Sequence, residues 1–488
     1  MLRYFFLSPG FCFIFTLPLV VFGQIFDVRD FGAINDGIVH NNTLAFAAAV
    51  TAASAWFKSS GGEQQGIVTV QGGGIYMSGR IELLTGVSLN IASDTVLKAS
   101  ANVSDYSYGN NVWAFLYSSG ANDFSITGGG IVNGNYEAFI GGFNETWDEF
   151  IPLTWPNCEG ECRPRLAMLT DSTQIVIHNI TFTGSPDWTF HLLNCTYVHV
   201  HHWIQSGDHR WPNNDGIDID SSSHVLVEDS TISTGDDGVC IKGSAPGVEV
   251  FNITVRRCTL SSRSSAIKFG SNNPVPTHSL LFEDILVLDS NRALALQTRD
   301  GGDVYDVMFR RIYINETRWW PIKWWGDASP IYISSMLRDS TDPGCNVYNI
   351  TFRDITAHSQ NSAVLSGISP GKKLTNITLN NVTIIIDRLP AWNYSIDSNP
   401  RVFPNIEYDP TLLIKPTRTD MTGWMPGLYV ENVEGLLLDG LNITFINDHY
   451  QMYWGSSCVN TTNANYPILY GKPTSCTPPT SRNKIGLN

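Results

Sequence analysis

The sequence is poor in positive charge. Its 488 residues include 30 lysines and arginines against 45 aspartates and glutamates, which gives a formal net charge of −15. A protein that binds nucleic acid needs a basic face to neutralise phosphates, so we expect no nucleic-acid partner. Charged residues of both signs make up only 15% of the chain and hydrophobic residues 43%, a composition typical of a folded globular protein.

Long apolar runs are absent beyond the N-terminus. Arg3 is followed by one apolar run that ends at Val21, and Val21-Phe22-Gly23 resembles a cleavage site before Gln24. This pattern predicts a secretory signal peptide over residues 1–23 and no membrane anchor, so we expect a secreted, extracellular protein. Several Asn-X-Ser/Thr sequons are consistent with glycosylation, among them those at Asn41, Asn102, Asn144, Asn252, Asn315, Asn393 and Asn460.

Cysteines are few, and metal-ligand spacing is missing. One of the nine cysteines, Cys12, lies in the predicted signal peptide, and the remaining even number favours disulfides in an oxidising compartment. Three pairings suit the spacing: Cys158–Cys162, Cys458–Cys476 and Cys240–Cys258. Cys195 and Cys345 have no obvious partner. The histidines near residues 191–202 alternate without Cys or Glu at ligand spacing, so we expect no metal and no cofactor.

Short strand-like runs recur along the chain at intervals of roughly 23 to 30 residues. They cover residues 174–177, 197–200, 224–227, 248–250, 279–282, 304–307, 347–350 and 374–377. Short strands at a fixed period indicate stacked coils, and inward Val, Ile and Leu predict an all-β, right-handed parallel β-helix. A β-propeller is the competing architecture, but its blades need about 40 or more residues each.

We therefore predict one solenoid domain over residues 24–450, with a C-terminal tail over 451–488 that packs on it. One helix is expected, from Leu44 to Phe57 after an Asn42-Thr43 cap, and it would close the N-terminal end of the solenoid. Residues 317–344 and 388–426 interrupt the repeat, and the first of these stretches carries four tryptophans at 319–325. These tryptophans suit either stacking on sugar rings or the packed core of the insertion.

Three carboxylates carry the strongest chemical signal. Asp215 lies in Asn213-Asn214-Asp215-Gly216, and Asp236 and Asp237 lie 21 residues further on, beside strand-like runs. If that interval is one coil, the three stack on one face, as acid/base hydrolysis of a glycosidic bond requires. The same segments are also ordinary turn sequences, which leaves a structural role open. Asp218 and Asp220 are expected to be structural, as hydrogen-bonding residues of the turn.

An ordered set of motifs resembles glycoside hydrolase family 28, the polygalacturonase family. The motifs are Phe26–Ala33 with Asp36-Gly37, Arg163-Pro164, Ser185–Trp188, Asn213–Asp218 and Gly235–Asp237. The resemblance extends from about Ile25 to Phe445. It implies inverting hydrolysis of a pectic plant cell-wall polysaccharide by a monomer, with Asp236 as the general acid and Asp215 and Asp237 activating water. The acidic net charge does not exclude such a substrate, because a few local cations suffice to bind carboxylates.

Two departures from the family pattern concern the substrate. No histidine occurs in Ser264–Gly270, where the family has Gly-His-Gly, and Ala295 and Gln297 stand where it has the two cations of Arg-Ile-Lys. Either nearby cations replace this clamp, or the substrate is another glycan, such as rhamnogalacturonan. The candidate substrate-binding residues are Lys242, Lys268, Arg292, Arg299 and Trp188.

Two other functions stay open. A non-catalytic glycan-binding protein would explain the missing histidine and clamp. A β-elimination lyase would need a strong base beside the uronate carboxyl, commonly with Ca²⁺, and the three aspartates match a hydrolase better.

Overall fold

The computed structural model describes residues 23–106, 114–153, 163–318, 326, 328–335, 343–367, 374–387, 395–396, 419–420, 427–431 and 433–446. Several predictions lie outside these residues: nearly all of the signal peptide, the tail after residue 450, the tryptophans at 319–325, and the pairs Cys158–Cys162 and Cys458–Cys476.

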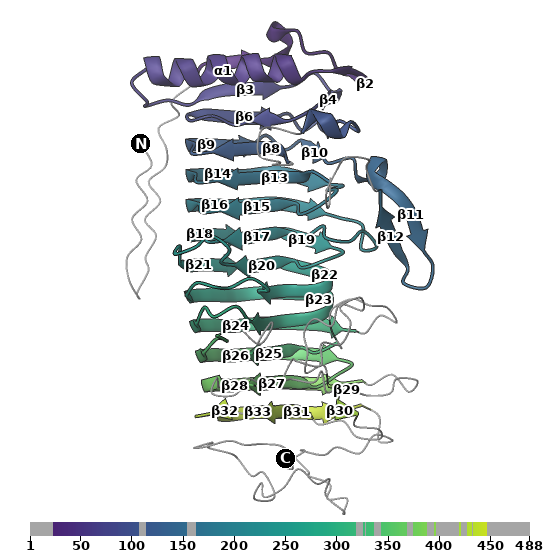
Figure 1. Cartoon of the computed structure of the whole chain (residues 1–488), viewed down its shortest axis with the longest axis vertical. Coiled ribbons are helices and arrows are strands. Elements are labelled where there is room, and N and C mark those ends of the chain that lie inside the picture. Colours follow the sequence, from purple (N-terminus) through teal and green to yellow (C-terminus); the bar gives the residue numbers. More distant parts are fainter. Residues whose placement is uncertain are drawn as a thin grey trace, which may run out of the picture.

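Stacked parallel strands form a long solenoid (Figure 1), which confirms the predicted parallel β-helix. Its first coils contain β1 (Ile25–Asp27), β2 (Asp36–Asn41), β3 (Gly66–Val70), β4 (Gly74–Ser78), β5 (Ile81–Glu82), β6 (Val87–Ile91), β7 (Thr95–Ala99), β8 (Ala114–Ser119), β9 (Asn122–Thr127) and β10 (Ile131–Asn133). The antiparallel hairpin of β11 (Ile140–Asn144) and β12 (Glu149–Pro152) projects from the side of the stack.

One series of paired strands carries the candidate site: β13 (Arg165–Thr170), β15 (Phe190–Leu193), β17 (Ile217–Asp220), β20 (Val239–Lys242), the ends of β22 (Thr259–Phe269) and β23 (Thr277–Thr298), β25 (Ile331–Ser335), β27 (Ala363–Gly367) and β31 (Leu428–Glu431). We call the outer side of β13 to β25 in this series the groove face. Its N-terminal half is β13, β15, β17 and β20, and its C-terminal half is the ends of β22 and β23 with β25.

The other faces contain β14 (Thr173–Thr183), β16 (Thr196–Ser206), β18 (Ser223–Glu228), β19 (Thr231–Thr234), β21 (Val250–Arg256), β24 (Val304–Thr317), β26 (Val347–Ser359), β28 (Leu374–Ile386), β32 (Val433–Glu434) and β33 (Leu437–Phe445), besides the short pair β29 (Ser395–Ile396) and β30 (Thr419–Asp420). The predicted strand runs lie in these strands, apart from residues 279–282, which lie in β23, and with one correction. Val248 and Glu249 precede β21, because the long loop after β20 delays the start of that strand to Val250.

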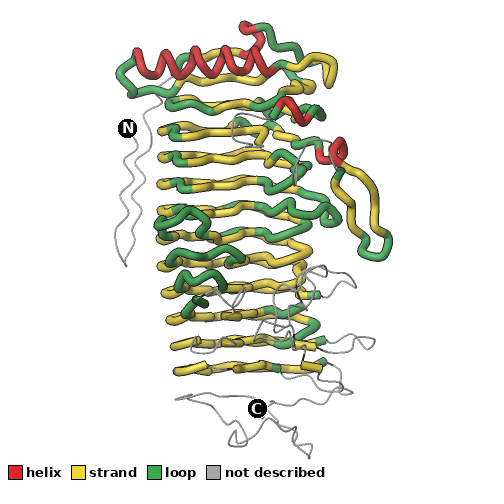
Figure 2. Tube along the Cα trace, viewed as in Figure 1, coloured by secondary structure: helices red, strands yellow, loops and turns green. Residues whose placement is uncertain are grey.

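Aligned apolar residues fill the interior. One row runs through successive coils in register: Ala167, Phe190, Ile217, Val239, Ile267, Leu294 and Ile331, all fully buried. Burial of each of the larger side chains in this row contributes about 1.5–3 kcal/mol relative to exposure. Because side chains alternate along a strand, the residues between these rows point outward, and on the groove face they carry the polar groups. Loops are concentrated where the strands turn from one face to the next (Figure 2).

The helix α1 (Thr43–Ser59) lies across the N-terminal end of the stack, as predicted. It buries Phe46, Ala49, Val50 and Ala53 against the first coil, which covers the apolar end of the core. Asn42 is its N-cap residue, but the side chain of Asn42 accepts a hydrogen bond from Ile34 N instead of a helix amide.

The predicted Cys240–Cys258 disulfide is wrong. Both residues are free, buried thiols, as is Cys195. Cys240 lies on the groove face in β20, whereas Cys258 lies between β21 and β22 at another corner of the coil. Residues on different faces of a coil cannot bring their Sγ atoms together without moving the backbone.

Candidate active site

Two turns before neighbouring strands place the three carboxylates together. Asp215 precedes β17 and Asp237 precedes β20, and the backbone N–H of Gly216 donates to Asp237 O at 2.9 Å. The side chain of Asn214 joins the two turns, because its Oδ1 accepts hydrogen bonds from the N–H groups of Gly235 at 2.7 Å and Asp236 at 3.1 Å. The predicted stacking across one coil is therefore present.

The carboxylates are buried at the boundary between the two halves of the groove face. Asp215, Asp236 and Asp237 are 3%, 4% and 3% exposed. One carboxylate oxygen each of Asp215 and Asp237 and the Sγ of Cys240 lie within 4.8 Å of one another. Acidic groups that are this close and poorly hydrated cannot all be ionised at once. The protonation of one carboxyl therefore changes the pKa of its neighbours.

The surroundings separate the pKa values of the carboxyls. Burial raises the pKa of Asp215 well above its ordinary value, and the neighbouring charges of Asp236, Asp218 and Asp237 add to the rise. Burial acts on Asp237 in the same direction, but the ammonium groups of Lys268 and Lys242, with hydrogen bonds from Lys268 and Ser264, hold its pKa below the ordinary value. The cluster thus contains one carboxyl that favours its proton and one that favours its charge.

Lys268 contacts this cluster directly. Its Nζ lies 3.0 Å from Asp237 Oδ2, and its side chain is 1% exposed. The hydroxyl of Ser264 donates to Asp237 Oδ1 at 2.8 Å. The stretch that lacks the family's histidine therefore provides an ion pair and a hydrogen bond to a carboxylate of the site. Lys268, a predicted substrate-binding residue, is already paired with Asp237.

The other predicted cations of the C-terminal half are also buried. Arg292 is paired with Ser265 in register, is fully buried, and places its guanidinium carbon 4.3 Å from the centre of the Tyr332 ring. Arg299 follows β23 and is 6% exposed. Ala295 and Gln297, the residues at the missing clamp, are paired with Tyr332 and Ser334 and are buried as well.

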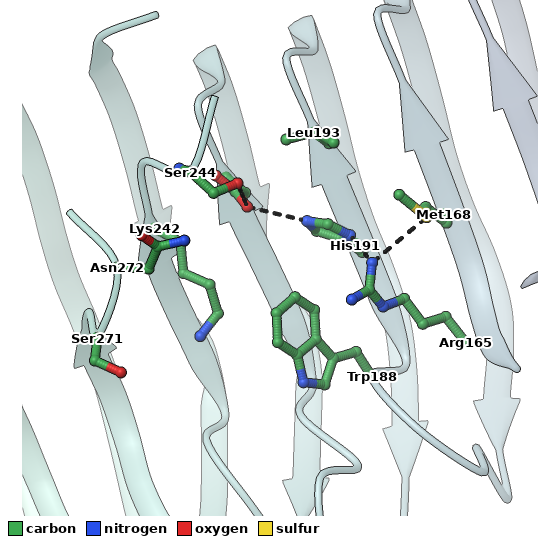
Figure 3. Close-up of a pocket in the computed structure, with 10 residues that line it drawn as sticks. Arg165, Met168, Trp188, His191, Leu193, Lys242, Ser244, Ser271 and Asn272 are labelled. Atoms are coloured by element: carbon green, nitrogen blue, oxygen red, sulfur yellow. Dashed lines mark hydrogen bonds and ion pairs between the residues drawn. The ribbon is translucent and has the colours of Figure 1, made fainter. Parts of the chain in front are cut away.

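A pocket of about 580 Å³ opens on the N-terminal half of the groove face (Figure 3). It is lined by Arg165, Met168, Trp188, His191, Leu193, Asp220, Lys242, Ser244, Ser271 and Asn272. Trp188 lies between the two cations: the guanidinium carbon of Arg165 is 4.2 Å from the centre of its ring, and Lys242 Nζ is 4.7 Å away. Of the predicted substrate-binding residues, Lys242 and Trp188 line this pocket.

A neutral histidine forms part of the pocket wall. Burial lowers the pKa of His191 to about 4. Its Nδ1 accepts from Arg165 at 2.7 Å, and its Nε2 is 3.3 Å from Asp220 Oδ2, which fits a proton on Nε2. Burial would raise the pKa of Asp220, but hydrogen bonds from His191 and Ser244 lower it to about 2. Asp220 is therefore ionised and fully engaged.

The fold and this geometry agree with a comparison of the chain with known families. Residues 77–392 match the family described as glycosyl hydrolases family 28. The chain belongs to this family. As a member of family 28, it is a polygalacturonase-type glycosidase that hydrolyses O-glycosidic bonds.

Curated relatives of family 28 are similar over most of the chain. A probable polygalacturonase of Vitis vinifera is 29% identical over 380 residues, which cover 73% of this chain and 73% of the relative. An endo-polygalacturonase of Pectobacterium carotovorum subsp. carotovorum is 24% identical over 331 residues, or 64% of this chain and 78% of that protein.

Solved structures share the fold. A family 28 exopolygalacturonase of Yersinia enterocolitica superposes with a TM-score of 0.66 at 16% identity, covering 92% of this chain and 79% of that one. A hyperthermoactive exopolygalacturonase of Thermotoga maritima gives 0.61 at 20% identity, covering 74% and 87%. Among the helices that the structure describes, none has the length and apolar character to cross a membrane.

Sequence reasoning missed several residues of the site. Asp218 and Asp220, expected to be structural, lie within β17 and point outward beside Lys242, whose Nζ is 3.5 Å from Asp218 Oδ1. Asp220 also hydrogen-bonds the following turn, as expected, because it accepts from Ser244 N at 2.6 Å. The alternation of Ile217-Asp218-Ile219-Asp220 was the signal, since a period of two puts both aspartates on one face. Arg165 had no such signal, because its role arises from contacts between coils.

One group of side chains has the spacing of metal ligands within the described ranges: Asp215, Asp237 and Cys240. The charges of Lys242 and Lys268 oppose a cation there, since Lys268 already pairs with Asp237 and the pKa of Lys242 is raised by its acidic neighbours against the effect of burial. The pKa of the Cys240 thiol is raised by burial, which disfavours the thiolate that binds metals. The expectation that no metal takes part stays a prediction.

Proposed function

We propose that the chain is a secreted, monomeric, inverting glycosidase that cleaves pectic polysaccharide, with Asp236 as the general acid and Asp215 and Asp237 activating the water. The observation that carries the proposal is the pair Asp215 and Asp237, two buried carboxyls with opposite pKa shifts and oxygens within 4.8 Å of each other.

That separation suits one shared water. Two hydrogen bonds of about 2.7–2.8 Å from one tetrahedral oxygen span about 4.5 Å. Asp237, kept ionised by Lys268, accepts the proton of the attacking water, and Asp215 orients the water through its second hydrogen bond.

Asp236 then protonates the leaving oxygen, the role that family membership suggests for this position. After burial, Asp236 is the largest charged contributor to the raised pKa of Asp215, so the two carboxyls interact strongly. In the inverting mechanism the acid and the base act on opposite faces of the sugar ring, with room for water on one side.

The pectic substrate and the location rest on separate observations. The curated relatives are named polygalacturonases, which supports a galacturonate-containing polysaccharide, with a polygalacturonase-like or rhamnogalacturonase-like specificity. The pattern of residues 1–23 supports secretion.

The test is a reducing-end assay of the secreted protein on polygalacturonate, rhamnogalacturonan and xylogalacturonan, with anomeric analysis of the first product by NMR. We expect an inverted product and a loss of at least about 100-fold in Asp236→Asn. The matched control is Asp306→Asn, which alters an exposed aspartate that accepts from Asn349. Silence on all three polysaccharides would favour a glycan-binding protein, and an unsaturated, chelator-sensitive product would favour a lyase.

A further inference from the structure

Two cations, Arg165 and Lys242, line the pocket of Figure 3, and Lys242 lies close enough to the carboxylate cluster to lower the pKa of Asp237. We propose that this pocket is the subsite that binds the carboxylate of an acidic sugar unit, through Arg165 and Lys242 held apart by Trp188. The inference rests on the proposed function and gives it a direction: the acidic unit lies on the N-terminal side of the cleavage point, and the unit on the other side need not be charged.

Position within the coils supports this direction. The N–H of Thr189 donates to Asp215 O at 2.8 Å, so Trp188 lies one coil before Asp215 at the equivalent place of its strand. Lys242 extends from β20 over the same region and lies 3.5 Å from Asp218. A sugar unit seated against Trp188 and Lys242 therefore lies next to the unit attacked at the carboxylates.

Around the pocket the cations Arg163, Arg165 and Lys242 outnumber by one the carboxylates that stay charged, Asp187 and Asp220. Arg165 lies 3.6 Å from Asp187, which Arg163 also approaches at 3.9 Å. Asp220 is engaged by His191 and by Ser244. Burial raises the pKa of Asp218, the partner of Lys242, to about 7, so in mildly acidic solution Lys242 faces a mostly neutral carboxyl.

The opposite rim suits the hydroxyl groups of a sugar. Ser244, Ser271 and Asn272 line the pocket across from Trp188 (Figure 3). A few polar groups around an aromatic residue and two cations match the mixed chemistry of a uronate, which has one charged group and several hydroxyls. A neutral hexose would offer the two cations no anionic group beyond Asp187 and the mostly neutral Asp218.

The C-terminal half of the groove face offers no equivalent pair among the residues described. Ala295 and Gln297 occupy the clamp positions, Lys268 is bound to Asp237, and Arg292 lies buried against Tyr332. Arg299 is 6% exposed and, like Lys268 and Arg292, is not among the residues that line the pocket. The substrate class that fits this asymmetry is a polysaccharide with a free uronate on one side of the cleaved bond and a neutral or esterified unit on the other.

Binding can be measured separately from turnover. In the background of Asp236→Asn, calorimetric titration would compare oligogalacturonate with the same oligomer fully methyl-esterified. Arg165→Gln and Lys242→Met are each expected to weaken binding of the acid by about tenfold or more and to leave the ester within about twofold. Lys242→Arg should keep the preference for the acid, and Arg353→Gln, an exposed arginine paired with Asp354, is the control.

The comparison of acid and ester separates recognition from folding. Equal losses for both oligomers, or no loss in either pocket variant, would overturn the inference, as would failure of the Asp236→Asn protein to distinguish the two oligomers. Turnover by the unmodified protein, abolished by Asp236→Asn, would in those cases leave the proposed function standing. Lack of turnover together with intact acid-selective binding would instead refute the proposed function and retain the subsite.

Discussion

The two halves of the groove face contain similar numbers of cations but use them differently. In the N-terminal half, Arg165 and Lys242 line an open pocket on either side of Trp188. In the C-terminal half, Lys268 forms an ion pair with Asp237, and Arg292 is fully buried. Whether a cation of a β-helix is available to a substrate therefore depends on its contacts with residues of the adjacent coils.

This difference also bears on the loss of the family's histidine and clamp. Lys268 and Ser264 hold Asp237 ionised, so the stretch without histidine still serves the cluster. The proposed binding of the substrate's carboxylate therefore lies in the N-terminal half.

The largest effect is expected at the boundary of the two halves. Asp237→Asn removes the proposed base and should lower kcat by about 100- to 10,000-fold. Steady-state kinetics on the best substrate measure this, with circular dichroism to check folding. A variant that keeps more than a tenth of the activity would show that Asp237 is not the base.

Lys268→Met tests whether the C-terminal cation serves the cluster or the substrate. Lys268 lowers the pKa of Asp237 against the effect of burial, so its loss should raise that pKa and shift the acidic limb of the pH–rate profile to higher pH. Leaving the buried carboxylate unpaired should also cost about 3–5 kcal/mol of unfolding free energy.

The matched control for Lys268→Met is Arg353→Gln, at an exposed ion pair with Asp354, where the cost should stay below about 1 kcal/mol. If Lys268→Met left the acidic limb unchanged but weakened binding of acidic substrates, Lys268 would be a substrate-binding residue. The proposed difference between the two halves would then be wrong.

Gln297→Lys should make the C-terminal half resemble the N-terminal half. Gln297 is paired with Ser334, and its side-chain amide nitrogen is buried without a hydrogen-bond partner. A lysine at this position would also lack a buried partner, so we expect its ammonium group to extend into the groove. We expect the kcat/KM ratio of polygalacturonate over its methyl ester to rise by up to about tenfold. Gln297→Met is the control with a side chain of similar length. If Gln297→Lys leaves the kcat/KM ratio unchanged, the proposal that the C-terminal half lacks a cation for the substrate is contradicted.

The smallest effect should come from removing metal ions. Because Lys242 and Lys268 oppose a cation at Asp215, Asp237 and Cys240, dialysis against EDTA should change kcat and the acid preference by less than about twofold. Loss of activity that added Zn²⁺ or Ca²⁺ restores would show that a metal, and not the lysines, balances the charge.

Much of this architecture could be predicted from the sequence. The repeat of apolar runs led to the β-helix, and the 21-residue interval between Asp215 and Asp236 led to carboxylates stacked on one face. These predictions succeed because both depend on spacing along the chain, which a solenoid converts directly into position.

Contacts between coils could not be predicted in the same way. The disulfide Cys240–Cys258 failed because loop length decides which face of the coil a residue occupies. The roles of Arg165 and His191 depend on register between β13, β15 and β17, which no local pattern states. The engagement of Lys268 by Asp237 likewise required the register of β20 against β22.

The most direct test is a crystal structure of Asp236→Asn with bound oligogalacturonate. The account predicts a sugar carboxylate within hydrogen-bonding distance of Lys242 Nζ and the Arg165 guanidinium, with the unit beyond Asp237 held by neutral side chains. Carboxylates gathered instead around Arg292 and Arg299, with the Trp188 pocket empty, would contradict it.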